Sequence, residues 1–208
     1  MTEDQPARSG EWRFLATIIA LAAIWMTMLL RGTGTFDRAV YEALYAGHRP
    51  VLAAVAHVLT ALGEPTVLIA ATLLCAIWLW RAGRAQLGLT LLLIAMVGRG
   101  MSEIQKYWIA RVRPDLEAHL VVVKTQSFPS GHATSSMIFY LTLALALTSG
   151  TRWQRPAVAG AIILSLLIGT SRVMLGVHWP SDVIGGWAFG MLWVLLTLRM
   201  AGRLLRRT

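Results

Sequence analysis

The sequence predicts an all-α, polytopic membrane protein with six transmembrane helices and a short interfacial or re-entrant helix between the first two. Hydrophobic residues make up 56% of the 208 residues, and charged residues make up only 14%. A soluble domain averages about 45–50% apolar and about 25% charged residues. The apolar residues also form long blocks instead of alternating with polar ones, which is typical of helices that cross a bilayer.

Six apolar blocks are long enough to cross a bilayer, which takes roughly 17–25 residues. They cover residues 12–30, 66–80 with a further turn before it, a segment from near Ala85 past Gly98 into a more polar tail, 130–148, 156–175 and 181–199. No repeat or long linker interrupts the chain, so residues 1–208 are expected to form a single domain.

A seventh apolar stretch, residues 51–62, has only 12 residues and stops at Gly63. This length is too short to span a bilayer, so we expect an interfacial or re-entrant helix. The alternative, a further span, would reverse the orientation of every segment that follows it.

Basic residues at the span ends predict the orientation. Arg81 and Arg84 lie between the second and third spans, and Arg152 and Arg155 lie between the fourth and fifth. Neither loop contains an acid, so the positive-inside rule assigns both loops to the cytoplasm. The other basic residues on this side are Arg8, Arg13, Arg199, Arg203, Arg206 and Arg207. Both termini are therefore expected in the cytoplasm, in a bacterial-type inner membrane, with the first span retained as an anchor.

Tryptophans at the predicted span ends fit an aromatic belt. They are Trp12, Trp78, Trp80 and Trp153 at the inner interface and Trp108 and Trp179 at the outer one.

The formal net charge of +9 would indicate nucleic acid binding on a soluble protein. Here the basic residues lie at the ends of apolar blocks and in short clusters, not along one polar face. A nucleic acid partner is therefore not expected. An anionic membrane surface or a phosphorylated lipid within the bilayer is the predicted partner.

Three polar segments interrupt the apolar chain, and the six-span topology places all three at the outer face. They are residues 106–114, 128–132 and 171–182. The cations in them are Lys106, Arg113 and Arg172, and an arginine fork matches phosphate oxygens. Ser130 and Gly131 begin a helix, whose free N–H groups favour an anion. These features together predict a site for a tetrahedral oxyanion.

Two histidines and a carboxylate complete the predicted site. Asp182, four residues after His178, can bond one imidazole nitrogen and leave the other free to attack. His132 comes from another span and is a candidate to protonate the leaving oxygen. A two-histidine, one-carboxylate metal site formed by the same residues is the alternative. Three nearby cations disfavour another cation, so no metal or cofactor is expected.

Other polar and small residues have structural interpretations. Arg99 and Glu103, spaced i, i+4, are predicted to form a local ion pair. Gly186 and Gly190 are predicted to pack helices, with dimerisation as the alternative, and no oligomeric state is predicted. Structural hydrogen bonds are expected for His48, His57 and His119.

The three segments resemble the signature of the type-2 phosphatidic acid phosphatase superfamily: Lys-x6-Arg-Pro, then Pro-Ser-Gly-His, then Ser-Arg-x5-His-x3-Asp. Every signature position is present between residues 106 and 182. The resemblance implies a helical membrane core and a metal-independent reaction through a phosphohistidine. It implies that His178 is the nucleophile, Asp182 its orienting partner and His132 the general acid. The implied phosphate-binding residues are Lys106, Arg113, Ser130, Gly131 and Arg172.

As a short chain with six predicted spans, the sequence resembles the members of this superfamily that act as phosphatidylglycerophosphate and undecaprenyl diphosphate phosphatases. The expected activity is hydrolysis of undecaprenyl diphosphate, phosphatidylglycerophosphate or phosphatidic acid. Two alternatives stay open: transfer of the phosphoryl group to a lipid acceptor, and a non-catalytic lipid-phosphate binder or transporter. A non-catalytic relative is expected to lack His132, His178 or Asp182, and all three are present.

The loop of residues 115–127 between the first two motifs holds candidates for head-group selection, namely Glu117, His119 and Lys124. The alternative is a solvated loop without such a role.

Overall fold

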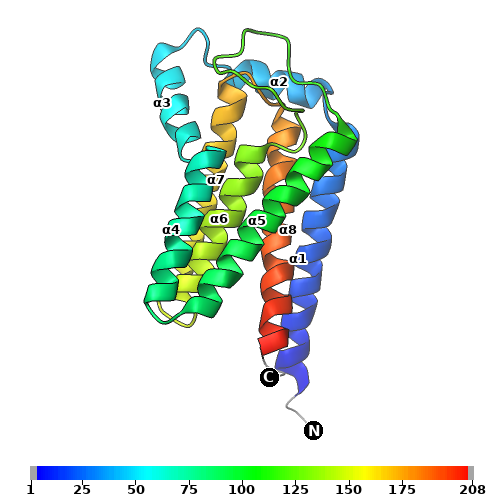
Figure 1. Ribbon diagram of the computed structural model, residues 1–208. Helices are drawn as coiled ribbons and strands as arrows, with labels where there is room; N and C mark the ends of the chain where they lie inside the picture. The colour runs from blue at the N-terminus through cyan, green and yellow to red at the C-terminus, as the bar shows by residue number, and fades with distance from the viewer. Residues whose placement is uncertain (1–3, 206–208) are drawn as a thin grey trace.

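A computed structural model describes residues 4–205, and side chains for residues 10–202. These residues form eight helices and no strand (Figure 1). The helices are α1 (Asp4–Arg31), α2 (Thr35–Leu44), α3 (Pro50–Ala61), α4 (Pro65–Arg81), α5 (Ala85–Ile109), α6 (Gly131–Thr148), α7 (Gln154–Met174) and α8 (Pro180–Leu205). The predicted all-α fold class is therefore confirmed. Four basic residues used to predict the orientation have side chains outside the described part: Arg8, Arg203, Arg206 and Arg207.

Five stretches of the described chain are long and apolar enough to cross a membrane. They are Gly10–Arg31, Pro50–Arg81, Ala85–Ile109, Gln154–Met174 and Pro180–Gly202. The protein is thus a multi-pass membrane protein. The fourth predicted span, residues 130–148, corresponds to α6, which is not among the five because polar residues in its first two turns lower its hydropathy. Those turns are nevertheless buried, since α6 packs against α4, α5, α7 and α8.

The stretch Pro50–Arg81 contains two helices separated by a turn. Helix α3 ends at Ala61, and the backbone of Glu64 is extended (φ −60°, ψ 131°) before Pro65 begins α4. The residue before a proline is biased toward extended conformations, which explains the break. A short helix is therefore present where residues 51–62 predict one.

The predicted topology has no helix between the first span and α3, yet α2 forms there. It lies across one end of the bundle (Figure 1). Tyr41 and Tyr45 stack with ring centroids 5.8 Å apart, and they pack against Val173 of α7 and Val183 of α8. A ten-residue helix with polar residues on one side contains no apolar block, which is why span length did not reveal it.

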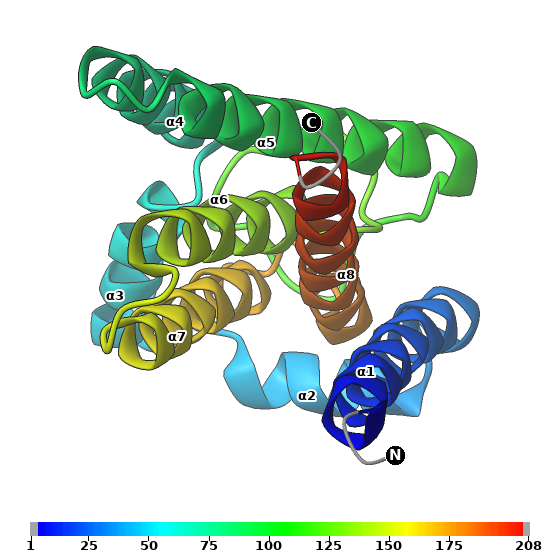
Figure 2. The ribbon, with the colours of Figure 1, turned by 90° about the horizontal axis from the view of Figure 1, so that it is seen from below.

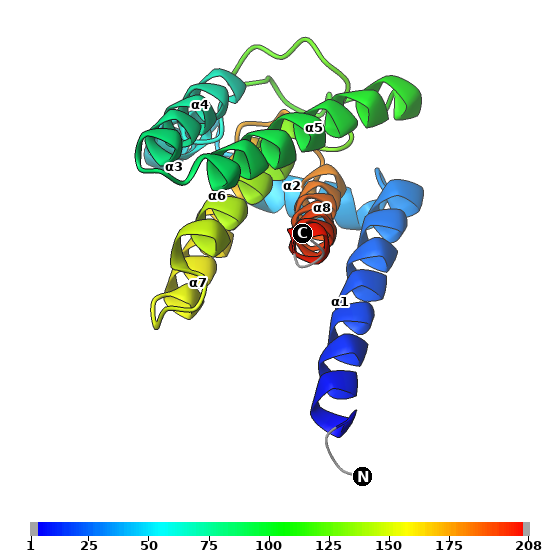
Figure 3. The same cartoon turned by 60° about the horizontal axis from the view of Figure 1, so that its bottom comes forward.

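Helix α8 packs on α1 on one side and on α5, α6 and α7 on the other. Seen from below, α8 lies between α1 and the α6–α7 pair, while α4 and α5 pack together on a further side (Figures 2 and 3). Helix α1 packs mainly on α8, and Arg199 of α8 pairs with Glu11 of α1 at 3.0 Å. The two helices at the ends of the chain are therefore neighbours.

Helix α8 approaches α6 closely at the two glycines predicted to pack helices. A Cβ atom on Gly186 would lie 3.0 Å from the Ser130 carbonyl oxygen, and one on Gly190 would lie 2.9 Å from the Thr134 carbonyl oxygen. The predicted packing role is confirmed. The predicted Arg99–Glu103 pair is also present, at 3.9 Å.

One of the six predicted interfacial tryptophans is placed differently. Trp179 is buried, and its indole N–H donates to the Val112 carbonyl at 3.1 Å. The prediction was wrong for this residue because Trp179 belongs to the connection between α7 and α8, which other segments cover. The other five, Trp12, Trp78, Trp80, Trp108 and Trp153, are all exposed.

Gly190→Val is expected to destabilise the bundle because its side chain meets the α6 backbone. Overpacking of this kind costs about 1–3 kcal/mol, so the melting temperature in detergent should fall. The matched control is Gly160→Val on α7, where a Cβ atom meets nothing within 4 Å. Equal melting temperatures for the two variants would contradict the close packing.

Candidate active site

The predicted site residues come from helix ends and connections at the end of the bundle that carries α2 and α3 (Figure 1). Lys106 is in the last turn of α5, and Arg172 is in the last turn of α7. Ser130 precedes α6, and Gly131 and His132 begin it. His178 lies between α7 and α8, whose first turn holds Asp182. Arg113 lies in the loop after α5. Seven of these eight residues are buried, and Arg113 is half-buried.

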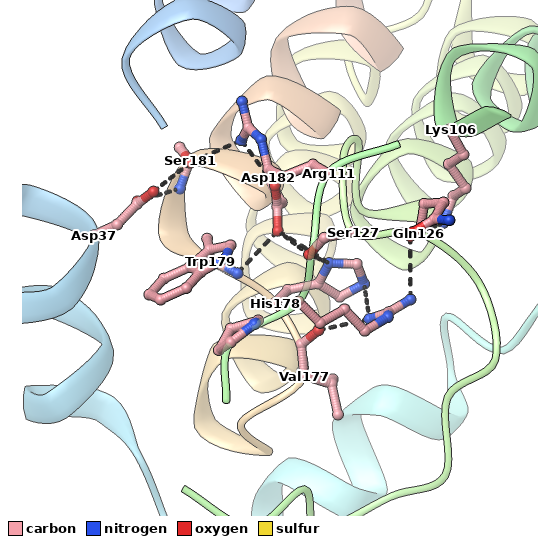
Figure 4. Close-up of polar contacts among 12 residues, drawn as sticks. Asp37, Lys106, Arg111, Gln126, Ser127, Val177, His178, Trp179, Ser181 and Asp182 are labelled. Carbon is pink, nitrogen blue, oxygen red and sulfur yellow. Dashed lines mark hydrogen bonds and ion pairs between the residues drawn. The ribbon is translucent and has the colours of Figure 1, made fainter. Parts of the chain in front are cut away.

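Asp182 holds His178 by one nitrogen (Figure 4). The Nδ1 atom of His178 lies 3.4 Å from Oδ2 of Asp182, so the predicted contact is present. The same oxygen accepts hydrogen bonds from the Ser127 hydroxyl at 2.5 Å and the Trp179 backbone N–H at 2.9 Å. The second bond caps the start of α8, as an acid three residues into a helix does in a capping box.

The other nitrogen of His178, Nε2, lies 3.1 Å from an Nη atom of Arg113. Burial, followed by the charges of Arg113, Lys106 and Arg172, holds the pKa of His178 well below its usual range. The imidazole is therefore neutral at neutral pH. With a proton on Nδ1 toward Asp182, Nε2 carries the lone pair, which accepts an N–H of Arg113 in this structure. A ring nitrogen with a lone pair is the form that a nucleophile requires.

Arg111 forms an ion pair with Asp182, although no motif in the sequence predicts a role for it. Its guanidinium donates to Oδ1 of Asp182 at 2.9 Å and to the Ser181 hydroxyl at 3.1 Å. It also donates to the carbonyls of Leu29 and Met28 at 2.7 and 3.0 Å. The last carbonyls of a helix lack intrahelical partners, so Arg111 ties the end of α1 to the buried carboxylate.

The pattern Arg111-Val112-Arg113 contained a usable signal. The segment follows the end of α5 and is not helical, and outside a helix an alternating pattern places residues i and i+2 on the same side, as in a strand. Val112 is exposed, whereas the two arginines reach Asp182 and His178. Both arginines therefore flank one imidazole–carboxylate pair.

Asp37 of α2 is a second residue without an assigned role. Its carboxylate accepts from the backbone N–H and the hydroxyl of Ser181 at 2.8 and 2.6 Å. It also accepts from the backbone N–H of Thr33 at 2.6 Å. A carboxylate at a helix N-terminus stabilises it, so α2 supports the helix that presents Asp182. No local pattern marks Asp37, because the contact joins residues 144 positions apart.

The predicted phosphate-binding residues lie close together, and some of their atoms have no partner. The Nζ atom of Lys106 would lie 3.5 Å from a Cβ atom on Gly131. The backbone N–H of Ser130 donates to the Asp182 carbonyl at 3.0 Å. The Ser130 hydroxyl and Nε of Arg172 are buried and have no hydrogen-bond partner among the described residues. Buried polar atoms are normally paired, so these donors suit an anion.

The loop of residues 110–130 contacts the site through its end. Arg113 donates to the Thr125 and Gln126 carbonyls at 2.7 and 3.3 Å, and to the Val177 carbonyl at 2.5 Å. Among the proposed head-group candidates, His119 instead contacts the Pro114 carbonyl at 2.7 Å. Glu117 and Lys124 are exposed. Between the first two motifs, residues 125–127 are thus the part that contacts Arg113, His178 and Asp182.

The last turn of α3 and the connection to α4 contribute one residue each, and neither has an assigned role. Thr60 accepts a hydrogen bond from Arg172 at 2.7 Å, and Glu64 contacts His132 at 3.2 Å. The metal alternative required His132, His178 and Asp182 to converge. Among the described residues, no three His, Cys, Asp or Glu side chains lie close enough together to hold a metal ion.

Comparisons with known proteins agree with the resemblance. A profile of the PAP2 superfamily matches residues 85–206. Phosphatidylglycerophosphatase B of Bacillus subtilis (strain 168) is 31% identical over 183 residues, which cover 86% of this chain and 88% of that protein. Undecaprenyl-diphosphatase of Sulfolobus acidocaldarius is 36% identical over 110 residues, half of each chain.

A solved structure has the same fold. The crystal structure of a PAP2-type phosphatidylglycerolphosphate phosphatase from Bacillus subtilis superposes with a TM-score of 0.82 at 27% identity. The match covers 90% of this chain and 96% of that one, so it includes helices beyond the residues that carry the motifs.

Arg111→Met is expected to destabilise the protein by about 3–5 kcal/mol, the usual effect of removing one partner of a buried ion pair. The reason is that Asp182 keeps its buried charge but loses its guanidinium. Chemical unfolding in detergent measures the effect, with Arg152→Met at the opposite end as control. In the double variant Arg111→Met/Asp182→Asn, part of the loss should be recovered. Purely additive effects of the two substitutions would contradict the pairing.

The lowered pKa of His178 predicts a pH-dependent stability. An unfolded imidazole binds a proton below about pH 6.5, while the folded one stays neutral, so the unfolded state gains protons as the pH falls. Its contribution to stability is therefore present above that pH and lost below it, by about 1.4 kcal/mol per pH unit. Unfolding of the wild type and His178→Gln between pH 7 and 5 measures this, and the variant should depend less on pH. Parallel curves would show that His178 titrates normally.

Proposed function

We propose that this chain, which belongs to the PAP2 superfamily, acts through a covalent phosphohistidine on His178. Like its relatives, it is a lipid phosphatase. The observation that carries this assignment is an imidazole that Asp182 holds through Nδ1 and whose Nε2 contacts the guanidinium of Arg113. The named relatives act on phosphatidylglycerophosphate and undecaprenyl diphosphate. The proposed substrates are these two lipids, with phosphatidic acid also accepted.

Binding of the phosphate group uses the charges and N–H groups gathered at the helix ends. Lys106, Arg113 and Arg172 neutralise the phosphate oxygens, and the Ser130 hydroxyl and Nε of Arg172 gain the partners that they lack. Gly131 at the start of α6 leaves room for the anion beside the free N–H groups of the helix. Fixed donors of this kind stabilise the charge of a transferring phosphoryl group.

The reaction then takes two steps. In the first, Nε2 of His178 attacks the terminal phosphorus, the bond from that phosphorus to the oxygen of the leaving lipid alcohol or lipid phosphate breaks, and His132 donates a proton to that oxygen. Asp182 stabilises the positive charge that develops on the His178 ring. In the second, water attacks the phosphohistidine, His132 takes the proton of the water, and inorganic phosphate leaves with the electron pair of the N–P bond returned to His178. No metal or cofactor is assigned to either step.

We propose six spans, with α6 crossing the membrane beside α5, α7 and α8. In this topology α2 and α3 lie at the outer interface, or α3 is re-entrant. Arg81, Arg84 and Arg152 lie at the end of the bundle opposite the site, and the exposed Trp78, Trp80 and Trp153 lie there too. This arrangement supports cytoplasmic termini and an outward-facing site in a bacterial-type inner membrane. The contact of α1 with α8 supports treating residues 1–208 as a single domain.

A phosphotransferase would share the phosphohistidine and differ only in the acceptor. A non-catalytic binder would need no imidazole–carboxylate pair, so the geometry of His178 and Asp182 favours an enzyme. The proposed assay separates these functions because it measures released inorganic phosphate.

Detergent-purified protein is expected to release phosphate in excess EDTA from undecaprenyl diphosphate, phosphatidylglycerophosphate and phosphatidic acid. The ranking of the three lipids identifies the preferred substrate. His178→Ala should lose the activity by several orders of magnitude, because no other side chain replaces the nucleophile. Release that EDTA abolishes would contradict the metal-free reaction. Absence of release, together with labelled phosphate on an added lipid alcohol, would indicate transfer instead of hydrolysis.

A further inference from the structure

Glu64 contacts the proposed general acid, and no motif accounts for it. Its Oε2 atom lies 3.2 Å from Nε2 of His132. The residue precedes α4 and forms no side-chain cap on its own helix, so its carboxylate is available to the histidine. Residues 62–64 also lie outside residues 85–206, which match the superfamily profile.

Three contacts hold this turn against the site. The Tyr140 hydroxyl, on the helix that carries His132, donates to the Leu62 carbonyl at 2.9 Å. The backbone of Gly63 passes so close that an added Cβ atom would contact Ile168 and lie 3.3 Å from Cδ2 of His132. Thr60, one turn earlier, accepts from Arg172. The position of the carboxylate is therefore defined by both neighbouring helices, α6 and α7.

The charges around His132 show why a carboxylate matters there. Arg172, Lys106 and Arg113 all act on its ring as positive charges. Positive neighbours disfavour an imidazolium, and a negative neighbour favours it. Glu64 is the carboxylate in hydrogen-bond contact with the His132 ring in the described structure. A general acid must hold a proton before the leaving oxygen departs, so this carboxylate opposes the effect of the phosphate-binding cations.

On the basis of the proposed function, we infer that Glu64 is a positioning residue for His132. Its carboxylate accepts the Nε2–H of the imidazolium and turns Nδ1–H toward the leaving oxygen. When the lipid oxygen departs, the Nδ1 proton moves to it and the ring becomes neutral while keeping Nε2–H toward Glu64. In the second step Nδ1 takes a proton from the attacking water. His178 has the opposite arrangement, with Nδ1 held by Asp182 and Nε2 free for chemistry.

The leaving group provides a test that a purely structural role does not affect. A departing alkoxide needs a proton from a general acid, whereas an acidic nitrophenolate departs without one. The two substrates are a long-chain alkyl phosphate and a long-chain nitrophenyl phosphate of matched chain length. The measurement is kcat/KM, which reports on the steps through the first irreversible one and therefore on formation of the phosphohistidine.

Glu64→Gln is expected to lower kcat/KM for the alkyl phosphate by at least about tenfold, a part of the 10²–10⁴ that general acid catalysis contributes. For the nitrophenyl phosphate kcat/KM should change less than about threefold. His132→Ala should show the same selectivity with a larger loss. The charge-matched control is Glu42→Gln, at an exposed position on α2, and it should change neither value.

Equal losses with both substrates, with or without a lower melting temperature, would overturn the inference, and so would no loss with either. Both results leave the proposed function standing provided that His178→Ala abolishes both activities. Failure of the proposed function has a different signature, namely that the wild type hydrolyses neither substrate. Glu64→Asp keeps the charge and should retain more alkyl phosphate activity than Glu64→Gln.

Discussion

The buried carboxylate of Asp182 is the constraint around which the rest of this structure is arranged. An ionised group without water requires partners, and here two of them precede Asp182 by three and four residues while the other two come from the loop that follows α5. They are the ring of His178, the hydroxyl of Ser127, the backbone N–H of Trp179 and the guanidinium of Arg111. Satisfying one carboxylate therefore fixes the α7–α8 connection and both ends of the loop that follows α5. The same contacts orient the imidazole, so the structural requirement and the chemical one coincide.

The two histidines lie in different surroundings although each contacts a carboxylate. His178 is held by an acid that is fully buried, whereas the Glu64 side chain beside His132 is about half exposed. A nucleophile must stay neutral and fixed, which burial among cations ensures. A group that gives up a proton and regains it needs access to water, which a half-exposed partner at the edge of the site provides. The two elements that carry no signature motif, α2 and the α3–α4 turn, support one histidine pair each.

The sequence predicted the features that depend on local pattern. Apolar length located the long helices, and Gly63 marked the break after α3. Motif spacing predicted a set of eight site residues that lie together at one end of the bundle. The missed features depend on pairing between segments far apart in the chain. Helix α2 has too few apolar residues to be recognised by length, and its place is determined by Tyr41 and Asp37 contacting α7 and α8. Arg111, Asp37 and Glu64 were unassigned because each is explained only by a partner 68 or more positions away. Trp179 was misplaced for the same reason.

The contact of Arg111 with the last carbonyls of α1 shows that the region matched by the superfamily profile depends on residues outside it. The profile of the superfamily begins at residue 85, which suggests that the part of the chain before it is an appendage. In this structure, however, the first half supplies Leu29, Asp37, Thr60 and Glu64 to residues of the second. A protein truncated to the matched region would keep every motif residue but lose the groups that orient them. The residues that orient the site therefore extend beyond the region that the superfamily profile matches, and the end of α1 is among them.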